Sequence, residues 1–203
     1  MQNHFFKSLL DRAGPVTLTL VAISVLVTLA TNFGRNGAIL QYFVFSSYEI
    51  LQGEVWRAVT PIFLHFPVMG IVFLHLLFNM MWLWDLGGVI EKRLSGKTLL
   101  GLTLIIGIFS NAVQYHFSGP YFGGMSGVVF GLLGYLWIRG KFDPFFGLRL
   151  NPVIVNFMLI WLLIGFTGLA GSVANAAHLS GLFLGGLFGF IAARTGGVQR
   201  QKR

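Results

Sequence analysis

The chain of 203 residues lacks cysteine altogether and is poor in charged side chains. Without cysteine it has no disulfide, no thiolate nucleophile and no metal site built on cysteine. Charged residues make up 10% of the chain, against about 25% in an ordinary soluble domain. Only six of them are acidic, so chemistry that needs paired carboxylates has few candidates. The composition argues against a soluble protein.

Hydrophobic residues make up 55% of the chain and gather in six long segments. A helix needs roughly 17–25 residues to cross a membrane, so the short first and fourth segments must tilt or thin the bilayer locally. The first has no clear signal-peptidase cleavage site, and we expect it to be retained as a span. The segments are 16–31, 70–90, 98–117, 123–138, 153–171 and 174–193.

The predicted fold class is therefore all-α. We expect a polytopic membrane protein in which residues 1–203 form a single bundle of six transmembrane helices. The one long connection, residues 34–69, is rich in aromatic side chains, and we expect it to form an external loop with short helices in the membrane interface.

The net charge of +8 is distributed unevenly along the chain. If the amino terminus is cytoplasmic, twelve of the fourteen basic side chains lie on the cytoplasmic side, and only Arg35 and Arg57 lie outside. This bias predicts that both termini are cytoplasmic. No basic segment is interleaved with aromatic residues, so we expect membrane lipid and no nucleic acid as the partner of this charge.

Four polar residues are expected at a similar depth in the bilayer. The second, fourth and sixth segments run in the same direction, and they carry His75 and Asn79, Ser126, and His178. At about 1.5 Å of rise per residue, all four lie roughly 5–14 Å below the outer boundary. A lone serine in such a helix is usually a packing residue, whereas an intramembrane histidine is functional by default. Their shared depth favours a common site.

The chemistry that fits these residues is attack of a hydroxyl on a carbonyl group. Ser126 would be the nucleophile and His178 the base, while His75, Asn79 and the backbone N–H of Ser126 would stabilise the oxyanion. Asp85, the only carboxylate inside a predicted span, lies about 9 Å deeper than Asn79. We therefore expect a Ser–His dyad without a carboxylate, and neither a metal nor another cofactor.

Small residues recur along one face of the two segments that carry the dyad, and they allow close contact between helices. They are Ala177, Gly181, Gly185 and Gly189 in the sixth segment, and Gly127, Gly131 and Gly134 in the fourth. In the third segment, Ser110, Asn111 and Gln114 are expected to make hydrogen bonds between helices.

Four motifs in this order resemble the rhomboid family of intramembrane serine proteases, in particular its compact six-helix bacterial members. They are Trp56-Arg57, His75-x-x-x-Asn79, Gly124-x-Ser126-Gly127, and Ala177-His178-x-x-Gly181-x-x-x-Gly185. The resemblance runs from about Trp56 to Gly189. Each motif is weak alone, but the ordered set on the expected helices is specific.

The resemblance implies cleavage of a peptide bond in or near a transmembrane segment of another protein, without a cofactor. It gives the dyad and oxyanion residues the roles described above. It also implies a bacterial cytoplasmic membrane location, with the active site toward the periplasm. The supporting residues would be Gly124, Gly127, Gly181, Phe130 and Gln114.

Substrate access in the family implies a gate beside a cap that joins the last two helices. That cap would be residues 168–175 here, with Phe166 as the gate side chain. Two features depart from the family pattern. Phe130 stands where many members have tyrosine, and the stretch between His65 and His75 is longer than in enteric relatives.

Two other functions are compatible with a polar site inside a membrane. One is a catalytically inactive relative that binds transmembrane clients, although such relatives usually lose the serine or the histidine. The other is a small transporter, although this chain lacks a charged pair at the midplane and an evident inverted repeat.

Overall fold

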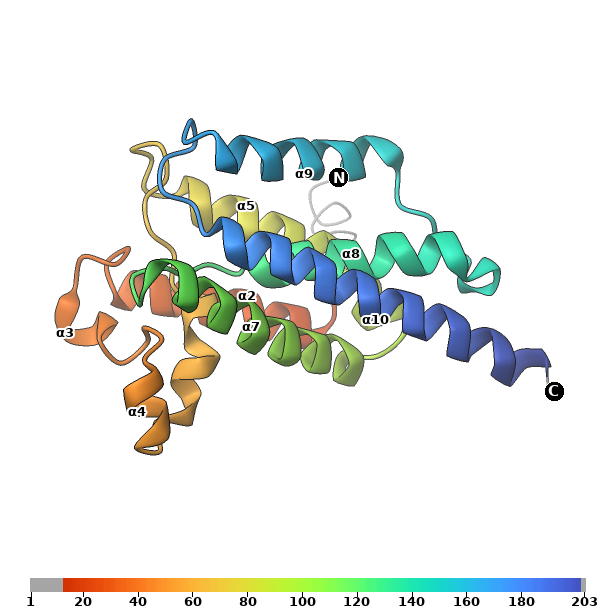
Figure 1. The fold of residues 1–203 in the computed structure, drawn as a ribbon, viewed down its shortest axis with the longest axis horizontal. Coiled ribbons are helices and arrows are strands. Elements are labelled where there is room, and N and C mark those ends of the chain that lie inside the picture. The colour runs from red at the N-terminus through yellow and green to blue at the C-terminus, as the bar shows by residue number, and fades with distance from the viewer. Residues whose placement is uncertain (1–12, 202–203) are drawn as a thin grey trace, which may run out of the picture.

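The computed structural model describes residues 13–201, with side chains as far as Thr195. Lys7, Arg12, Lys202 and Arg203, which enter the charge bias, lie outside the described residues. Every element in the described part of the chain is helical, which confirms the all-α class (Figure 1).

The elements follow one another from α2 near the amino terminus to α10 at the carboxyl terminus. α5, η3 and α6 form one continuous helix in which η3 is a π-helical turn. The bounds are α2 Pro15–Ala30, α3 Gly37–Leu40, α4 Ser47–Leu51, η1 Val55–Ala58, η2 Thr60–Phe63, α5 Leu74–Trp82, η3 Leu83–Gly87, α6 Gly88–Arg93, α7 Gly96–Ser118, α8 Ser126–Phe142, η4 Pro144–Phe146, α9 Pro152–Phe166 and α10 Asn175–Gln201.

Several helices differ from the predicted segments. The second was expected to begin at residue 70, but α5 begins at Leu74. The fourth was expected to begin at residue 123, but α8 begins at Ser126 because Gly124, with φ +124°, does not adopt a helical conformation. The fifth was expected to reach residue 171, but α9 ends at Phe166. Gly168 and Gly171, both with φ +78°, turn the chain after it.

Two helices in the described part of the chain are long and apolar enough to cross a membrane on their own. They are Gly96–Ser118 and the Asn175–Thr195 part of α10, and α2 and α9 are apolar but shorter. The bundle of six spans therefore stays a prediction.

α8 and α10 cross with their backbones in direct contact. A Cβ atom on Gly181 would overlap the carbonyl oxygen of Gly127, and one on Gly185 would overlap that of Gly131. On Gly189, a Cβ would lie 2.5 Å from the carbonyl oxygen of Tyr135. Because only glycine permits this approach, the small residues of these helices determine how far apart they lie.

The start of α2 is capped by a side chain from α6. The Glu91 carboxylate accepts hydrogen bonds from the backbone N–H groups of Val16 and Thr17, each at 2.8 Å, and from the Thr17 hydroxyl at 2.7 Å. Burial alone would raise the pKa of the Glu91 carboxyl, but these hydrogen bonds outweigh it and lower the pKa below its ordinary value. The charged carboxylate therefore ties the first helix to the end of α6.

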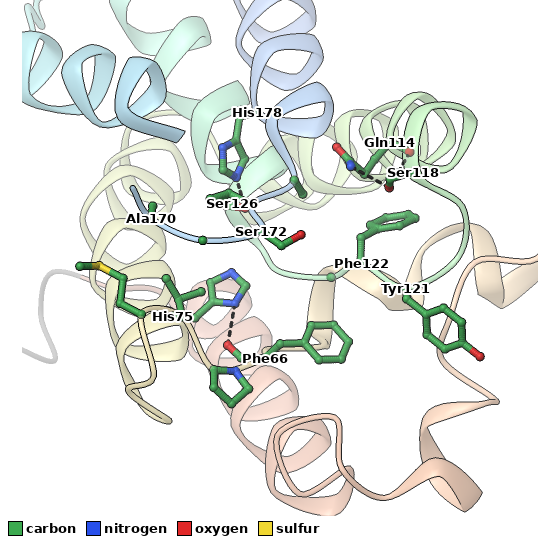
Figure 2. A pocket seen from close by; sticks show the side chains of 17 residues that line it. Phe66, His75, Gln114, Ser118, Tyr121, Phe122, Ser126, Ala170, Ser172 and His178 are labelled. Carbon is green, nitrogen blue, oxygen red and sulfur yellow. Dashed lines mark hydrogen bonds between the residues drawn. The ribbon is translucent and has the colours of Figure 1, made fainter. Parts of the chain in front are cut away.

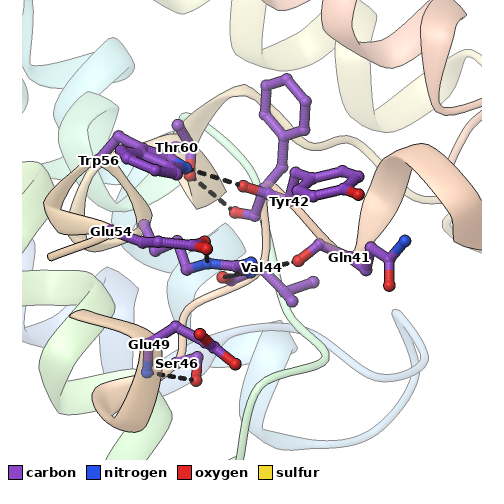
Figure 3. A network of polar contacts seen from close by, with 10 residues as sticks. Gln41, Tyr42, Val44, Ser46, Glu49, Glu54, Trp56 and Thr60 are labelled. Atoms are coloured by element: carbon purple, nitrogen blue, oxygen red, sulfur yellow. Dashed lines mark hydrogen bonds and ion pairs between the residues drawn. The ribbon is translucent and has the colours of Figure 1, made fainter. Parts of the chain in front are cut away.

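The 34–69 loop is held by a buried arginine. The Arg57 guanidinium, in a side chain only 6% exposed, donates to the carbonyl oxygens of Gln41 and Val44 and pairs with Glu54. Trp56 and Thr60 donate to neighbouring carbonyl groups of the same loop (Figure 3). The short helices α3, α4, η1 and η2 confirm that this loop is structured.

Replacement of Gly181 by alanine should destabilise the protein by about 2 kcal/mol or more, because the added methyl group forces α8 and α10 apart. Gly186→Ala is a matched control on the same helix, since its Cβ would meet only Ile138 Cγ1 at an ordinary 3.4 Å. The free energy of unfolding, measured by titration with a denaturing detergent, should fall for Gly181→Ala and stay level or rise for Gly186→Ala. Equal losses in both variants would contradict this account of the helix contact.

Candidate active site

Ser126 is the first residue of α8, so its backbone N–H is one of the four that a helix leaves without an intrahelical partner. The chain reaches it through two glycines in close contact with their surroundings. A Cβ on Gly123 would lie 2.6 Å from Leu64 Cβ, and Gly124 N–H donates to the carbonyl oxygen of Pro61 at 3.0 Å. These contacts fix the position of the segment that leads into α8, and with it the position of Ser126.

His178 lies one turn into α10, and its side chain is 3% exposed. Its Nε2 is 2.7 Å from Ser126 Oγ, the closest polar contact in the site (Figure 2). Its Nδ1 is buried and has no hydrogen-bond partner among the described residues. The Phe130 ring packs against the imidazole instead, with centroids 4.9 Å apart. The orientation of this histidine therefore depends on packing rather than on an acid.

His75 and Asn79 reach the site from α5, one helical turn apart. His75 Nδ1 donates to the carbonyl oxygen of Phe66 at 3.2 Å, and a Cβ on Gly124 would lie 2.6 Å from His75 Nε2. The Asn79 amide donates to the carbonyl oxygen of His75 at 3.0 Å, which leaves its second N–H for another acceptor. The structure thus brings the four predicted polar residues together.

Two cavities meet at the dyad. The first, of about 390 Å³, is lined by loop residues together with Gln114 and Ser118 (Figure 2). The second, of about 300 Å³, lies between α5 and α9 and is lined largely by apolar and aromatic side chains. His75, Ser126 and His178 line both cavities. No carboxylate among the described residues lines either one.

Aromatic side chains close the seam between α5 and α9. Phe78 stacks on Trp161 and Trp82 packs against Phe157, each pair with ring centroids 6.1 Å apart. Phe166, the expected gate residue, is the last residue of α9, is 57% exposed and lines neither cavity. The family resemblance gave Phe166 as a candidate for the gate, whereas Phe78 and Trp161 are rings that meet across the seam.

The polar residues of α7 support the site from the side. Gln114 Oε1 accepts the backbone N–H of Ala177 at 3.0 Å, next to His178, and its Nε2 donates to Ser118 Oγ at 2.9 Å. Asn111 donates to the carbonyl oxygen of Ala58 at 2.9 Å and so holds the long loop. Ser110 Oγ donates to the carbonyl oxygen of Gly107 in its own helix. It also packs against Gly127, where an added Cβ would lie 2.7 Å from this hydroxyl.

His65 is a central residue to which the sequence reasoning assigned no role. Its side chain is 1% exposed. Its Nδ1 lies 3.1 Å from Thr28 Oγ1, and its Nε2 accepts a hydrogen bond from the Met125 N–H at 3.5 Å. Its ring also packs edge-on against His75 at 5.0 Å. Burial lowers the pKa of His65 well below its ordinary value, and His75 lowers it further. The sequence did contain a signal for this residue, because His65 lies only ten residues before His75, a predicted oxyanion residue.

The fold and the site together define a helical protein with a hydroxyl–imidazole pair held between closely packed apolar helices. A family model for the rhomboid domain matches residues 52–195. The chain belongs to the rhomboid family.

The relatives with similar sequences include rhomboid proteases from enterobacteria. Rhomboid protease GlpG of Salmonella newport (strain SL254) is 41% identical over 188 residues, which are 92% of this chain and 66% of the relative. The protein of the same name from Enterobacter sp. (strain 638) is 42% identical over 182 residues, which are 89% of this chain and 64% of the relative. The chain thus spans about two thirds of the length of these relatives.

The buried neutral His65 should make the protein less stable in acid. Its pKa is lower in the folded than in the unfolded state, so its contribution to stability is full above about pH 6.5 and is lost as the pH falls below that value. For His65→Gln, the free energy of unfolding should fall less steeply below pH 6.5, by roughly 1.4 kcal/mol per pH unit.

His116→Gln is the matched control for this prediction, because His116 is exposed at the end of α7. Because His116→Gln leaves the buried imidazole of His65 in place, it should not reproduce the shallower slope expected for His65→Gln. A His65→Gln curve that runs parallel to the parent would show that His65 takes up its proton equally in both states.

Proposed function

We propose that this protein is an intramembrane serine endopeptidase that hydrolyses peptide bonds in or near the transmembrane segments of other membrane proteins. The observation that carries the proposal is the 2.7 Å contact between Ser126 Oγ and His178 Nε2 where a cavity lined by loop residues meets an apolar one. The printed names of the relatives, rhomboid protease, support the same activity.

In the first step Ser126 Oγ attacks the carbonyl carbon of the substrate peptide bond. His178 Nε2 accepts the hydroxyl proton and then returns it to the leaving amine as the C–N bond breaks. The acyl group remains on Ser126 Oγ. Water in the first cavity then attacks the ester, with His178 again accepting and returning a proton, which releases the acid product and restores the serine.

The negative charge on the substrate oxygen needs donors in fixed positions. The backbone N–H of Ser126, at the positive end of α8, and the second amide N–H of Asn79 are both available. Whether His75 Nε2 can donate to the oxyanion depends on the protonation state of the ring. While Nδ1 donates to the Phe66 carbonyl oxygen, a neutral ring has no proton on Nε2, so His75 donates from Nε2 only as the doubly protonated cation.

The proposed dyad works without a carboxylate, so packing must orient the base. The Phe130 ring lies on the His178 imidazole, and the hydrogen bond from Ala177 N–H to Gln114 holds the start of α10. The glycine contact between α8 and α10 fixes the distance between nucleophile and base. The phenylalanine at position 130 supplies the ring without a hydroxyl.

The apolar cavity supports access of substrate from the side of the bundle. Its aromatic lining suits the side chains of a transmembrane segment, and the seam between α5 and α9 is where such a segment would enter. We propose accordingly that six helices cross a bacterial cytoplasmic membrane, with both termini cytoplasmic and the site toward the periplasm. α9 lies along one edge of the fold (Figure 1), and we propose that this helix moves when substrate enters.

Cleavage of a fluorescent transmembrane-segment substrate by the purified protein tests the proposed reaction. Ser126→Ala and His178→Ala should each reduce kcat/KM by at least about a thousandfold, as loss of a nucleophile or its base does in other serine hydrolases. Ser180→Ala is the matched control and should retain full activity, because Ser180 Oγ bonds the carbonyl oxygen of Ala176 in its own helix.

Undiminished cleavage in either dyad variant would refute the assigned roles. Binding of many substrates without cleavage by the parent would instead indicate an inactive client-binding relative. Transport of a solute by reconstituted protein that binds no such segment would indicate a transporter.

The gate should be controlled by the Phe78–Trp161 pair rather than by Phe166. Trp161→Ala removes a ring that closes the seam and should raise the cleavage rate of a membrane-embedded substrate roughly twofold to tenfold, if opening limits the rate. Phe166→Ala, a similar truncation on the same helix, should leave the rate unchanged because the side chain lines neither cavity. The reverse pattern would restore Phe166 as the gate residue.

A further inference from the structure

A third hollow, separate from the two cavities at the dyad, lies along the halves of α8 and α10 that are distant from Ser126. It has a volume of about 410 Å³ and runs between the two helices. Its lining is entirely apolar among the described residues: Gly134, Trp137, Ile138, Phe142, Leu182, Phe183, Gly186, Leu187 and Phe190. From Gly134 to Phe142 it extends along roughly 12 Å of helix.

Two cations lie at the far end of this groove. Phe142 and Phe190 meet there edge to face, with ring centroids 5.5 Å apart. Lys141 Nζ lies 5.7 Å from the Phe142 centroid, and the Arg194 guanidinium carbon lies 5.0 Å from that of Phe190. The ring pair thus holds one cation from each helix at the end of a channel suited to hydrocarbon.

Among residues 13–195, neither of these two charges is paired with an acidic side chain. The ion pairs among the described residues are Arg57–Glu54 and Arg139–Asp143, and neither includes Lys141 or Arg194. Arg139, the nearest other cation on α8, also bonds the Tyr135 hydroxyl and lies over Phe146. Among the described residues, this end of the groove therefore carries an unbalanced positive charge.

We propose that this groove binds one anionic phospholipid, with an acyl chain along Trp137, Leu182 and Gly186 and the phosphate between Lys141 and Arg194. An apolar channel that ends in two cations matches a molecule with a hydrocarbon chain and a negatively charged head. A zwitterionic phospholipid would bring its own cation to the same place. The site needs only that α8 and α10 lie in a bilayer, and not the proposed cleavage.

Quenching of Trp137 by brominated lipid tests the site directly. The full chain is reconstituted in phosphatidylcholine vesicles that contain a small fraction of phosphatidylglycerol brominated on its acyl chains. The Trp137 contribution is the difference between the parent and Trp137→Phe. At equal mole fraction, brominated phosphatidylglycerol should quench Trp137 several times more strongly than brominated phosphatidylcholine.

Charge variants test the proposed head-group contact. Removal of each cation, as Lys141→Gln or Arg194→Gln, should weaken the preference for the anionic lipid roughly fivefold. Lys141→Arg and Arg194→Lys should preserve it. Lys92→Gln with Lys97→Gln is the matched control. It removes two exposed cations on other helices, whereas Lys141 and Arg194 lie over the Phe142 and Phe190 rings of the groove.

Three results would overturn the proposal. Equal quenching by the two brominated lipids would show that the groove does not select charge. An equal loss of preference in the Lys92 and Lys97 control would assign the preference to general surface charge. Absence of Trp137 quenching by either lipid would show that protein, such as a second copy of this chain, covers the groove. Each readout stays valid in a Ser126→Ala background, so it is independent of proteolysis.

Discussion

The contact between the backbones of α8 and α10 is the constraint on which the site depends. Gly181 and Gly185 of α10 lie so close to Gly127 and Gly131 of α8 that a Cβ on either α10 glycine would overlap a carbonyl oxygen of α8. Ser126 and His178 lie at the same end of this contact, one on each helix, and their 2.7 Å separation follows from it. An apolar interior alone would not define that distance, because side chains of other sizes can pack at many helix separations.

A second constraint is a set of hydrogen bonds between uncharged polar groups, which connect the segments around Ser126 and His178. His65 accepts the Met125 N–H beside Ser126, Gln114 accepts the Ala177 N–H beside His178, and Asn111 holds the long loop at Ala58. Each bond joins segments more than fifty residues apart in the sequence. In a site of low polarity, such hydrogen bonds are costly to leave unmade, so they specify one arrangement. In the proposed mechanism, they provide the positioning that a carboxylate gives to the base of a catalytic triad.

Local pattern and family motifs predicted much of this from the sequence. The all-helical class and the family are confirmed, and the residues expected at one depth do come together. The predicted roles of Ser126 and His178 remain predictions that the geometry supports. The start of α8 was placed three residues early, because apolar composition alone does not reveal that Gly124 has a positive φ.

The features that were missed depend on contacts distant in sequence. Glu91 caps a helix 74 residues away, which no local pattern records. His65 is buried and packs against His75, a contact between residues ten positions apart. Trp161 rather than Phe166 faces α5, because the two residues lie on different sides of α9. Hydropathy cannot separate two aromatic residues on one apolar helix, since both favour the membrane. Which aromatic side chain of α9 faces α5 was therefore not predictable from hydropathy.

The same helix pair links the dyad to the groove at its opposite end. Gly134 of α8 and Gly186 of α10 lie against each other and both line the groove. An acyl chain between Trp137 and Leu182 would therefore contact the same helix pair that sets the distance between Ser126 and His178. A bound lipid can alter the site only if it favours one separation of α8 and α10 over another. The backbone contact leaves little room for such a change, because closer approach is blocked by carbonyl oxygens. The proposed lipid would therefore stabilise the helix pair without changing the geometry of the dyad, so it would affect stability more than catalytic rate.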